Sequence, residues 1–195
     1  TILVTGGAGY IGAHMVKALR HAGFRPVVLD DLSSGHRSAV RGEELHVGDV
    51  GDAAFVDRVL AEVRPAAVMP FAGFIQVGES VVDPGKYCRN NVTATQVLLD
   101  AMRMHGIARF IFSSTAAIFG EPDYVPIDEA HPKAPTNPYG RSKWMVEQML
   151  SDYDRAYALK SVCLRYFNAA GADPEGELGE RHEPETHLVP LILQV

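Results

Sequence analysis

A tyrosine and a lysine four residues apart, Tyr139 and Lys143, are the residues in the sequence best suited to proton transfer. Asn137 and Pro138 precede them and suit the N-cap and first position of a helix, so both side chains should share one helical face. A phenol with a pKa near ~10 is almost fully protonated at neutral pH, but a neighbouring ammonium favours its ionised form. We therefore predict that Tyr139 is a general acid–base group whose pKa is lowered with the help of Lys143.

Three hydroxyl residues, Ser113, Ser114 and Thr115, follow the apolar run Phe110–Phe112. In a doubly wound sheet the carboxyl ends of the strands face the ligand cleft. A hydroxyl there can hydrogen-bond both a substrate and the tyrosine. The other interpretation is that these hydroxyls only solvate the end of a strand.

A glycine-rich turn lies between the first apolar run and the first segment of helical period. It contains G-x-G-x-x-G beginning at Gly7 and G-x-x-G-x-x-G beginning at Gly6, and the latter continues through Gly9 to Gly12. Such glycines make the tight turn, remove a Cβ that would block a pyrophosphate, and let helix and strand pack closely. The helix N-terminus then supplies amides and a positive dipole, so we predict a dinucleotide site here.

Two aspartates, Asp30 and Asp31, end the second apolar run. An acid at this position accepts hydrogen bonds from the adenosine ribose and repels a 2′-phosphate, which favours NAD over NADP. A turn-forming Asp pair is the alternative. Asp49 follows the third candidate strand, where it could meet an adenine amino group, although Asp49 taken alone is better explained as a turn aspartate.

The composition is that of an ordinary globular chain: 195 residues, 47% hydrophobic, 22% charged, with a formal net charge of −6. This charge argues against a nucleic-acid partner, which would need a basic face. The two cysteines show no paired spacing, and neither a membrane span nor a signal peptide is visible, so we expect a reducing, cytoplasmic setting and no membrane partner. Both ends look cut, which suggests a piece of a longer protein.

Apolar runs alternate with segments of helical period along the chain. The runs do not alternate with polar residues, as is typical of strands buried on both faces of a parallel sheet. They are 2–4, 27–29, 67–71, 110–112 and 162–164, with a weaker candidate at 44–47. Helical segments are expected from Ile11 and over 53–63, 84–105 and 138–158. The pattern predicts an α/β fold with a doubly wound parallel sheet of the Rossmann type.

Taken together, these motifs resemble the extended short-chain dehydrogenase/reductases and, among them, the UDP-glucose (UDP-galactose) 4-epimerases. The resemblance covers essentially all 195 residues. The glycine turn and Tyr139–Lys143 define the superfamily, whereas Val77–Ser80 and Arg165–Asn168 point to the epimerases. The other matching stretches are Leu29–Leu32, Gly48–Val50, Phe71–Gly73, Asn90–Val92 and Ser113–Thr115.

The resemblance implies an enzyme that holds NAD as a prosthetic group. Tyr139 would take the proton of the sugar C4 hydroxyl while hydride passes to NAD, and the 4-keto sugar would then be reduced on its other face. Thr115 would assist Tyr139, while Lys143 would lower the pKa of Tyr139 and hold the nicotinamide ribose. The positively charged nicotinamide ring also favours the phenolate. The implied cofactor contacts are Gly6, Gly9, Tyr10, Ile11, Gly12, Asp30, Asp31, Asp49, Val50, Phe71, Ala72, Gly73, Asn90, Ser113, Tyr139, Lys143 and Phe167.

The same resemblance implies a UDP-sugar substrate held by Thr115, Tyr139, Asn168, His187 and Leu188. It divides the chain into an NAD-binding domain, residues 1–165, and the beginning of a substrate lobe, residues 166–195. Family members continue into a smaller C-terminal lobe, and a homodimer is expected at full length. Ile75 departs from the family pattern because many epimerases have lysine there, so one cofactor contact is lost or replaced.

Other functions remain open at this stage. A 4,6-dehydratase needs an Asp-Glu pair after the threonine, but Ala116 and Ala117 stand there. A UDP-pentose 4-epimerase and a UDP-glucuronate decarboxylase are sister enzymes of the same fold. NAD binding without turnover is a further alternative for the fragment.

A histidine-rich segment, residues 182–187, superficially resembles a zinc-protease helix. It has one residue too many between its histidines, and Pro184 would disrupt the helix, so we predict no metal.

Overall fold

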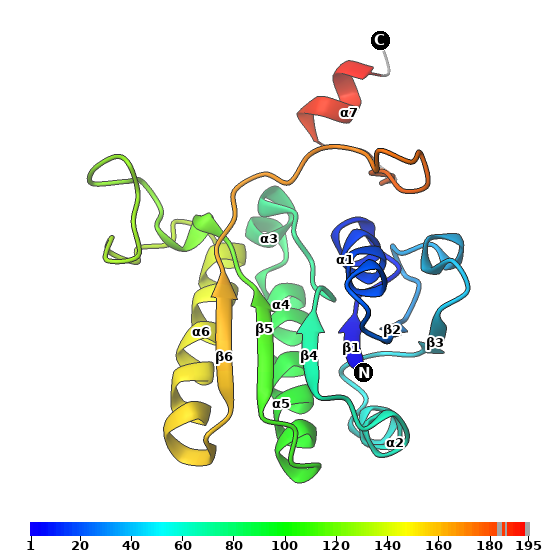
Figure 1. Cartoon of the computed structure of the whole chain (residues 1–195). Helices are drawn as coiled ribbons and strands as arrows, with labels where there is room; N and C mark the ends of the chain where they lie inside the picture. Colours follow the sequence, from blue (N-terminus) through cyan, green and yellow to red (C-terminus); the bar gives the residue numbers. More distant parts are fainter. Residues whose placement is uncertain (183–184, 186, 194–195) are drawn as a thin grey trace.

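A computed structural model describes residues 1–182, 185 and 187–193 of the chain. Six parallel strands form one sheet in the order β3-β2-β1-β4-β5-β6 (Figure 1). The expected α/β fold with a doubly wound parallel sheet is therefore confirmed. The strands are β1 (Ile2–Thr5), β2 (Pro26–Asp30), β3 (Glu44–Val47), β4 (Ala67–Pro70), β5 (Arg109–Ser113) and β6 (Lys160–Leu164).

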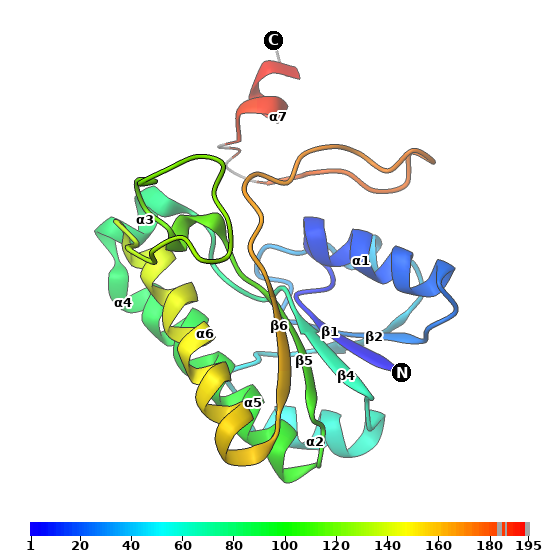
Figure 2. The same ribbon diagram turned by 60° about the vertical axis from the view of Figure 1, so that its left-hand side comes forward.

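Helices cover both faces of the sheet, with α1 on one face and the larger group on the other (Figure 2). The helices are α1 (Tyr10–His21), α2 (Ala53–Val63), α3 (Val77–Val82), α4 (Pro84–Tyr87), α5 (Ala94–Met104), α6 (Pro138–Tyr157) and α7 (Leu188–Leu193). Short 3-10 turns span Arg37–Val40 and Ala116–Ile118. None of the helices in the described ranges is long and apolar enough to cross a membrane.

The core has two parts, one on each face of the sheet. The larger part packs side chains of α2, α5 and α6 against the strands and includes Leu60, Leu99 and Leu150. The smaller part lies under α1 and includes Val16 and Val28. Every residue of β1, β2 and β4 is buried, as the unbroken apolar runs predict.

The sheet is less fully covered at β6 than the sequence predicts. Val162 is 56% exposed and Leu164 41% exposed, while Cys163 between them packs against the larger core. The prediction that residues 162–164 are buried on both faces is therefore wrong for this structure. The reason is that no helix within the described ranges lies over β6 on the side of the sheet that α1 occupies (Figure 2).

The expected helix over 84–105 also differs in detail. It is a continuous helical run of α4, a π-helical turn over Cys88–Thr93, and α5. Helix α3, six residues long, was not predicted because its segment is too short to show a period. Strand β6 ends at Leu164, and the division at residues 165/166 stays a prediction.

Candidate active site

The glycine turn after β1 is shaped by two close backbone approaches. Gly6 has φ +70°, and a Cβ there would lie 2.3 Å from the Ala72 backbone nitrogen. A Cβ at Gly12 would lie 2.1 Å from the Gly6 carbonyl oxygen. Both positions therefore require glycine. A Cβ at Gly9, in contrast, would lie 3.4 Å from its nearest neighbour, the Gly6 carbonyl oxygen. The space beside the N-terminus of α1 therefore stays free for a ligand.

A groove of about 570 Å³, partly open to solvent, runs along the carboxyl ends of β1 to β4. The strand order reverses between β1 and β4, which is where doubly wound sheets bind ligands. The predicted cofactor residues that line the groove are Gly6, Gly9, Asp30, Asp31, Asp49, Val50, Phe71, Ala72, Gly73 and Asn90. The structure therefore brings most of that predicted set to one place.

Asp30 is the buried acid of this groove, with 6% exposure. Its Oδ2 accepts a hydrogen bond from the Ala8 amide at 2.9 Å and its Oδ1 one from the Leu32 amide at 2.8 Å. Burial raises the pKa of Asp30, and these two amides oppose the rise. Each oxygen keeps a second lone pair, so Asp30 can both brace the glycine turn and accept from a ribose hydroxyl.

The other two groove aspartates make local turns. Asp31 Oδ1 accepts from the Ser33 amide and hydroxyl, and Asp49 Oδ1 accepts from the Gly51 amide at 2.7 Å. The turn roles that the sequence left open for both residues are thus present. Both carboxylates still border the groove.

The first turn of α1 and the C-terminal loop meet outside the groove. Tyr10 donates from its hydroxyl to the Gly171 carbonyl oxygen at 2.6 Å, and Ile11 follows it in the helix. Neither residue lines the groove, so their predicted cofactor contacts stay predictions.

Helix α6 presents the candidate proton-transfer residues at its N-terminus. The Asn137 side chain accepts a hydrogen bond from the Gly140 amide at 2.8 Å, and Pro138 occupies the first turn, as predicted. Tyr139 is half-buried, and its ring meets the ring of Tyr87 edge-on at 6.5 Å.

The predicted lowering of the Tyr139 pKa is not found in this structure. Burial raises the pKa of the phenol, Thr115 lowers it through a side-chain hydrogen bond, and Tyr166 raises it. Desolvation outweighs the hydroxyl because burial disfavours the charged phenolate. The ammonium of Lys143 is not among these influences, since it is engaged elsewhere.

Lys143 is buried beneath the groove. Its Nζ donates to the Ser113 carbonyl oxygen at 3.0 Å and lies 5.0 Å from the centre of the Phe112 ring. Burial lowers the pKa of Lys143 to about 8. A Cβ at Gly73 would lie 3.5 Å from this Nζ, so the lysine adjoins the wall of the groove.

The hydroxyl residues after β5 have separate partners. Thr115 Oγ1 accepts from the Ala117 amide at 3.1 Å, and the Ser113 hydroxyl pairs with the Tyr166 hydroxyl. Ser114 donates to Glu147 at 2.5 Å. Ser114 is buried and ties α6 to the end of β5, so strand-end solvation does not describe it, whereas Thr115 lies beside Tyr139.

Two polar groups near the site were missed in the sequence. Glu147 is buried, accepts from Ser114, and forms an ion pair with Arg165 at 2.7 Å. Its position four residues after Lys143, on the same helical face, is the signal that could have revealed it. Tyr87 donates to Glu79 at 2.9 Å and packs on Tyr139, which gives the Val77–Ser80 stretch a structural role.

Further groove residues were missed after the Asp pair. Ser33, Ser34 and Gly35 line the groove, and a Cβ at Gly35 would lie 2.9 Å from the Ala8 Cβ. The run of small residues Ser33–Gly35, which begins two residues after Asp31, was the available signal.

The residues expected at the nicotinamide and the sugar lie on the chain after β6. Phe167 is 68% exposed and Asn168 is exposed. His187 is half-buried, and Leu188 begins α7 with 73% exposure. Their predicted roles stay predictions.

Comparison with known proteins places this arrangement in a family. The sequence matches the NAD dependent epimerase/dehydratase family over residues 2–194. The chain belongs to this family. It is 54% identical over 193 residues to a UDP-glucose 4-epimerase of Rhizobium leguminosarum bv. trifolii, covering 99% of this chain and 59% of that protein.

Solved structures agree with that match. The UDP-glucose 4-epimerase of Brucella ovis in complex with NAD superposes with a TM-score of 0.96 and 53% identity, covering 97% of this chain and 58% of that chain. The UDP-glucose 4-epimerase of Bifidobacterium longum in complex with NAD+ and UDP gives a TM-score of 0.89 and 38% identity. This match covers 93% of this chain and 57% of that chain. The chain thus spans somewhat less than three fifths of the length of these relatives.

Proposed function

We propose that the complete protein interconverts UDP-glucose and UDP-galactose with NAD as its bound cofactor. The observation that carries the proposal is the contact between the two halves of the site. Gly73 lines the nucleotide groove and adjoins the Lys143 ammonium, which shares a face of α6 with Tyr139. The groove and the proton-transfer residues therefore form one site, and relatives about 50% identical carry the name UDP-glucose 4-epimerase.

The residues of the groove fit a dinucleotide. The open space beside Gly9 faces the N-terminus of α1, where no side chain caps the first amides, and these can receive a pyrophosphate. At the adenosine end of the groove, the Asp30 carboxylate would accept a hydrogen bond from a ribose hydroxyl. When bound, NAD would supply the reversible oxidation of the sugar at C4.

The protein residues divide the remaining work. Tyr139 Oη takes the proton of the C4 hydroxyl and returns it, and the Thr115 hydroxyl stabilises the ionised phenol by hydrogen bonding. Lys143 donates a hydrogen bond to the Ser113 carbonyl at the end of β5, and its ammonium would also contact a ribose hydroxyl beside Gly73. Asn168, His187 and Leu188 would contact the UDP-sugar, and Phe167 the nicotinamide.

Dehydration is a weaker alternative on this site. The residues directly after Thr115 are Ala116 and Ala117, in a 3-10 turn that carries no acid or base. The geometry therefore supports proton transfer at one hydroxyl without elimination.

The test is conversion of UDP-galactose by the full-length protein, followed by chromatography of the nucleotide sugars. We expect UDP-glucose to form, and Tyr139→Phe to lower kcat by a factor of roughly 10² to 10⁴ while NAD binding is kept. Tyr153→Phe is the matched control, because Tyr153 lies on the same helix and its hydroxyl contacts Asp100 in α5 at 2.7 Å. Absence of UDP-glucose, or a Tyr139→Phe rate equal to the control, would refute the proposal.

The wider organisation is also part of this proposal. A homodimer at full length rests on the family resemblance, and sedimentation velocity tests it. A cytoplasmic location is supported by two free cysteines, Cys88 and Cys163.

A further inference from the structure

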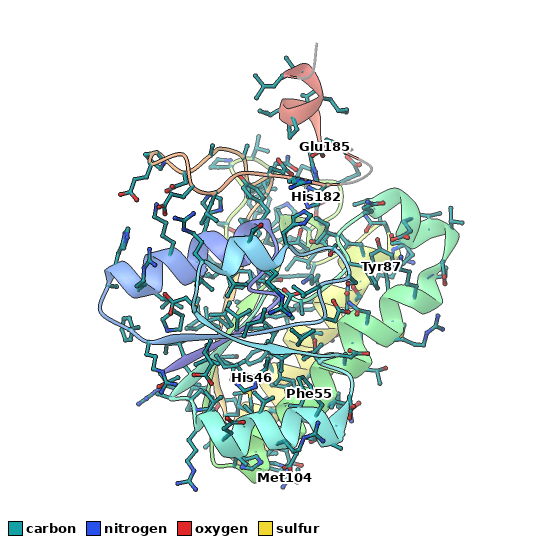
Figure 3. The ribbon with its side chains drawn as sticks, turned by 90° about the vertical axis from the view of Figure 1, so that its right-hand side faces the viewer. His46, Phe55, Tyr87, Met104, His182 and Glu185 are labelled. Atoms are coloured by element: carbon teal, nitrogen blue, oxygen red, sulfur yellow. The ribbon has the colours of Figure 1, made fainter. Side chains whose placement is uncertain are left out.

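Four side chains from the loop before α7 converge on one point: Glu180, His182, Glu185 and His187. Each offers one donor atom, and these atoms lie within 4.8 Å of one another. Figure 3 shows His182 and Glu185 near each other at the base of α7. We call these four residues the histidine–glutamate cluster.

The spacing of the donor atoms suits a small metal ion. The Glu180 Oε1 atom is 2.8 Å from His187 Nδ1 and 3.3 Å from His182 Nδ1. Glu185 places Oε1 3.0 Å from His187 Nδ1 and Oε2 3.8 Å from His182 Nδ1. Ligands about 2.0–2.1 Å from a tetrahedral zinc ion are roughly 3.3–3.4 Å apart, which falls within this spread.

A second observation comes from His182 itself. Its Nδ1 atom is buried and makes no hydrogen bond within the described residues, although Glu180 Oε1 lies 3.3 Å away. A buried nitrogen without a partner calls for a physical explanation, because leaving it unsatisfied is costly. A metal ion at the centre of the cluster would use the lone pair of this nitrogen.

We propose that the histidine–glutamate cluster binds one divalent transition-metal ion of the zinc class. Two imidazoles with two carboxylates are a donor set that zinc accepts and that magnesium and calcium do not favour. With neutral imidazoles the two carboxylates carry two negative charges, which a divalent ion neutralises. The step is coordination only and involves no electron transfer.

The site differs from the helical metal motif that the sequence excludes. The described residues of this segment form a loop, whereas Glu183, Pro184 and Thr186 lie outside the described residues. A loop does not need the spacing of a helix, so the argument against a zinc-protease helix does not apply to this cluster. The expectation of no metal stays a prediction, which the experiment below sets against this site.

A bound ion would have a structural consequence near the nucleotide groove. His182 and Arg181 border a small pocket that is also lined by Ala8, Gly9 and Tyr10 at the N-terminus of α1. By joining Glu180 to His187, the ion would fix the loop beside that terminus. The cluster shares His187 with the proposed UDP-sugar site, but the test measures metal binding alone and does not depend on the proposed epimerase activity.

The experiment uses the untagged chain after chelator treatment and dialysis. Zn²⁺ is titrated against a chromophoric chelator, and Co²⁺ is added separately to record its visible absorption. We expect one Zn²⁺ per chain and the intense Co²⁺ bands of four-coordinate geometry. His182→Gln and Glu180→Gln should each weaken Zn²⁺ binding at least tenfold, with unchanged circular dichroism.

His46→Gln is the matched control. His46 belongs to another histidine–acid group, with Glu44 and Glu62, on the β3 side of the molecule, well away from His182 in Figure 3. The control should bind Zn²⁺ like the parent chain. The proposal is overturned if binding is not stoichiometric, if His46→Gln weakens it as much as His182→Gln, or if the cluster variants bind normally. The cluster would then be a set of histidine–carboxylate hydrogen bonds.

Discussion

Lys143 and Tyr139 share one face of α6. Burial lowers the pKa of Lys143 and raises the pKa of Tyr139, so it favours the neutral form of both side chains. Their four-residue spacing made the shared face predictable. Their protonation could not be predicted, because it depends on neighbours brought by other elements, such as Phe112 under Lys143 and Tyr87 beside Tyr139. Sequence spacing therefore identifies the pair, whereas packing decides its charge.

Lys143 should make stability depend on pH. Below pH 8 the lysine is protonated in both states, and the native state bears the cost of burying the charge. Between about 8 and the unfolded value near ~10.4 the native state has lost the proton and the unfolded state still holds it, so the free energy of unfolding rises with pH. Relative to Lys143→Met, wild type should gain about 3 kcal/mol across this window.

Urea unfolding of both chains at pH 7.5, 9 and 10.5 measures this difference. Taking the difference cancels other groups that titrate in the same range, such as Cys163, whose pKa burial raises to about 11. Lys160→Met is the control, because Lys160 is exposed and pairs with Asp154 in solvent. The prediction would be contradicted if the difference in unfolding free energy between wild type and Lys143→Met changed with pH as little as the difference for Lys160→Met.

Asp30 should select NAD over NADP. Its carboxylate lines the groove and is braced by the Ala8 and Leu32 amides, so it cannot easily swing away from a 2′-phosphate. We expect the full-length protein to bind NAD at least ~10-fold more tightly, a difference of about 1.4 kcal/mol or more. Calorimetry with both nucleotides measures it. Asp30→Asn should reduce the difference between the NAD and NADP affinities, whereas Asp49→Asn should leave it unchanged. Equal affinities of the wild-type protein for NAD and NADP would disprove the role assigned to Asp30.

Glu147 and Arg165 join three elements beneath the active site. Glu147 on α6 accepts from Ser114 after β5 and pairs with Arg165 after β6. Only 4% of the Glu147 side chain is exposed, so these partners replace the water that burial removes from the carboxylate. The link therefore holds the start of α6, with Tyr139 and Lys143, against the ends of β5 and β6.

Arg165→Met should destabilise the fold by about 3 kcal/mol, because it leaves a buried carboxylate without its cation. Adding Glu147→Gln to Arg165→Met should recover part of this loss, since the remaining amide is neutral. Urea unfolding of wild type, both single variants and the double variant gives the coupling. Additive effects of the two substitutions would show that the pair does not stabilise the link between these elements.

At the scale of elements, the sequence predicts best where a segment is buried on both faces. The runs at β1, β2 and β4 have no exposed position, so their composition alone identifies them. Strand β6 alternates between core and solvent because a single layer of helices covers it within the described ranges. The π-helical turn over Cys88–Thr93 leaves no periodic signal distinct from the helices on either side of it.

On the scale of the whole molecule, the chain after β6 crosses back over the sheet and lies near α1 (Figures 1 and 2). Leu178 is buried against this side of the molecule, in a hollow lined by Ala13 and Val16. Contacts separated by more than 150 residues could not be predicted from local patterns. The sequence showed only a loop rich in Gly, Pro and Glu.

Lys17 is the main polar link of this crossing. Its Nζ lies 2.7 Å from Asp173, 2.6 Å from Glu175 and 3.1 Å from Glu177. Burial alone would lower the pKa of Lys17, but its hydrogen bonds to these carboxylates together raise that pKa above its usual value. Since Lys17 is in α1 and the three acids are in one loop, the ammonium fixes the loop on the helix that begins the nucleotide site.

Lys17→Met should therefore release the loop while leaving the sheet intact. The methionine keeps an apolar stem beside Leu178, but three carboxylates then repel one another without a cation. We expect amide hydrogen exchange over residues 173–178 to become about threefold faster or more, with β1 and β4 unchanged. Lys160→Met removes a lysine paired only with Asp154 on the surface and should leave the loop as slow as in wild type. Equal exchange in Lys17→Met and wild type would mean that Leu178 packing alone holds the loop, and that the charges around Lys17 contribute nothing measurable to its position.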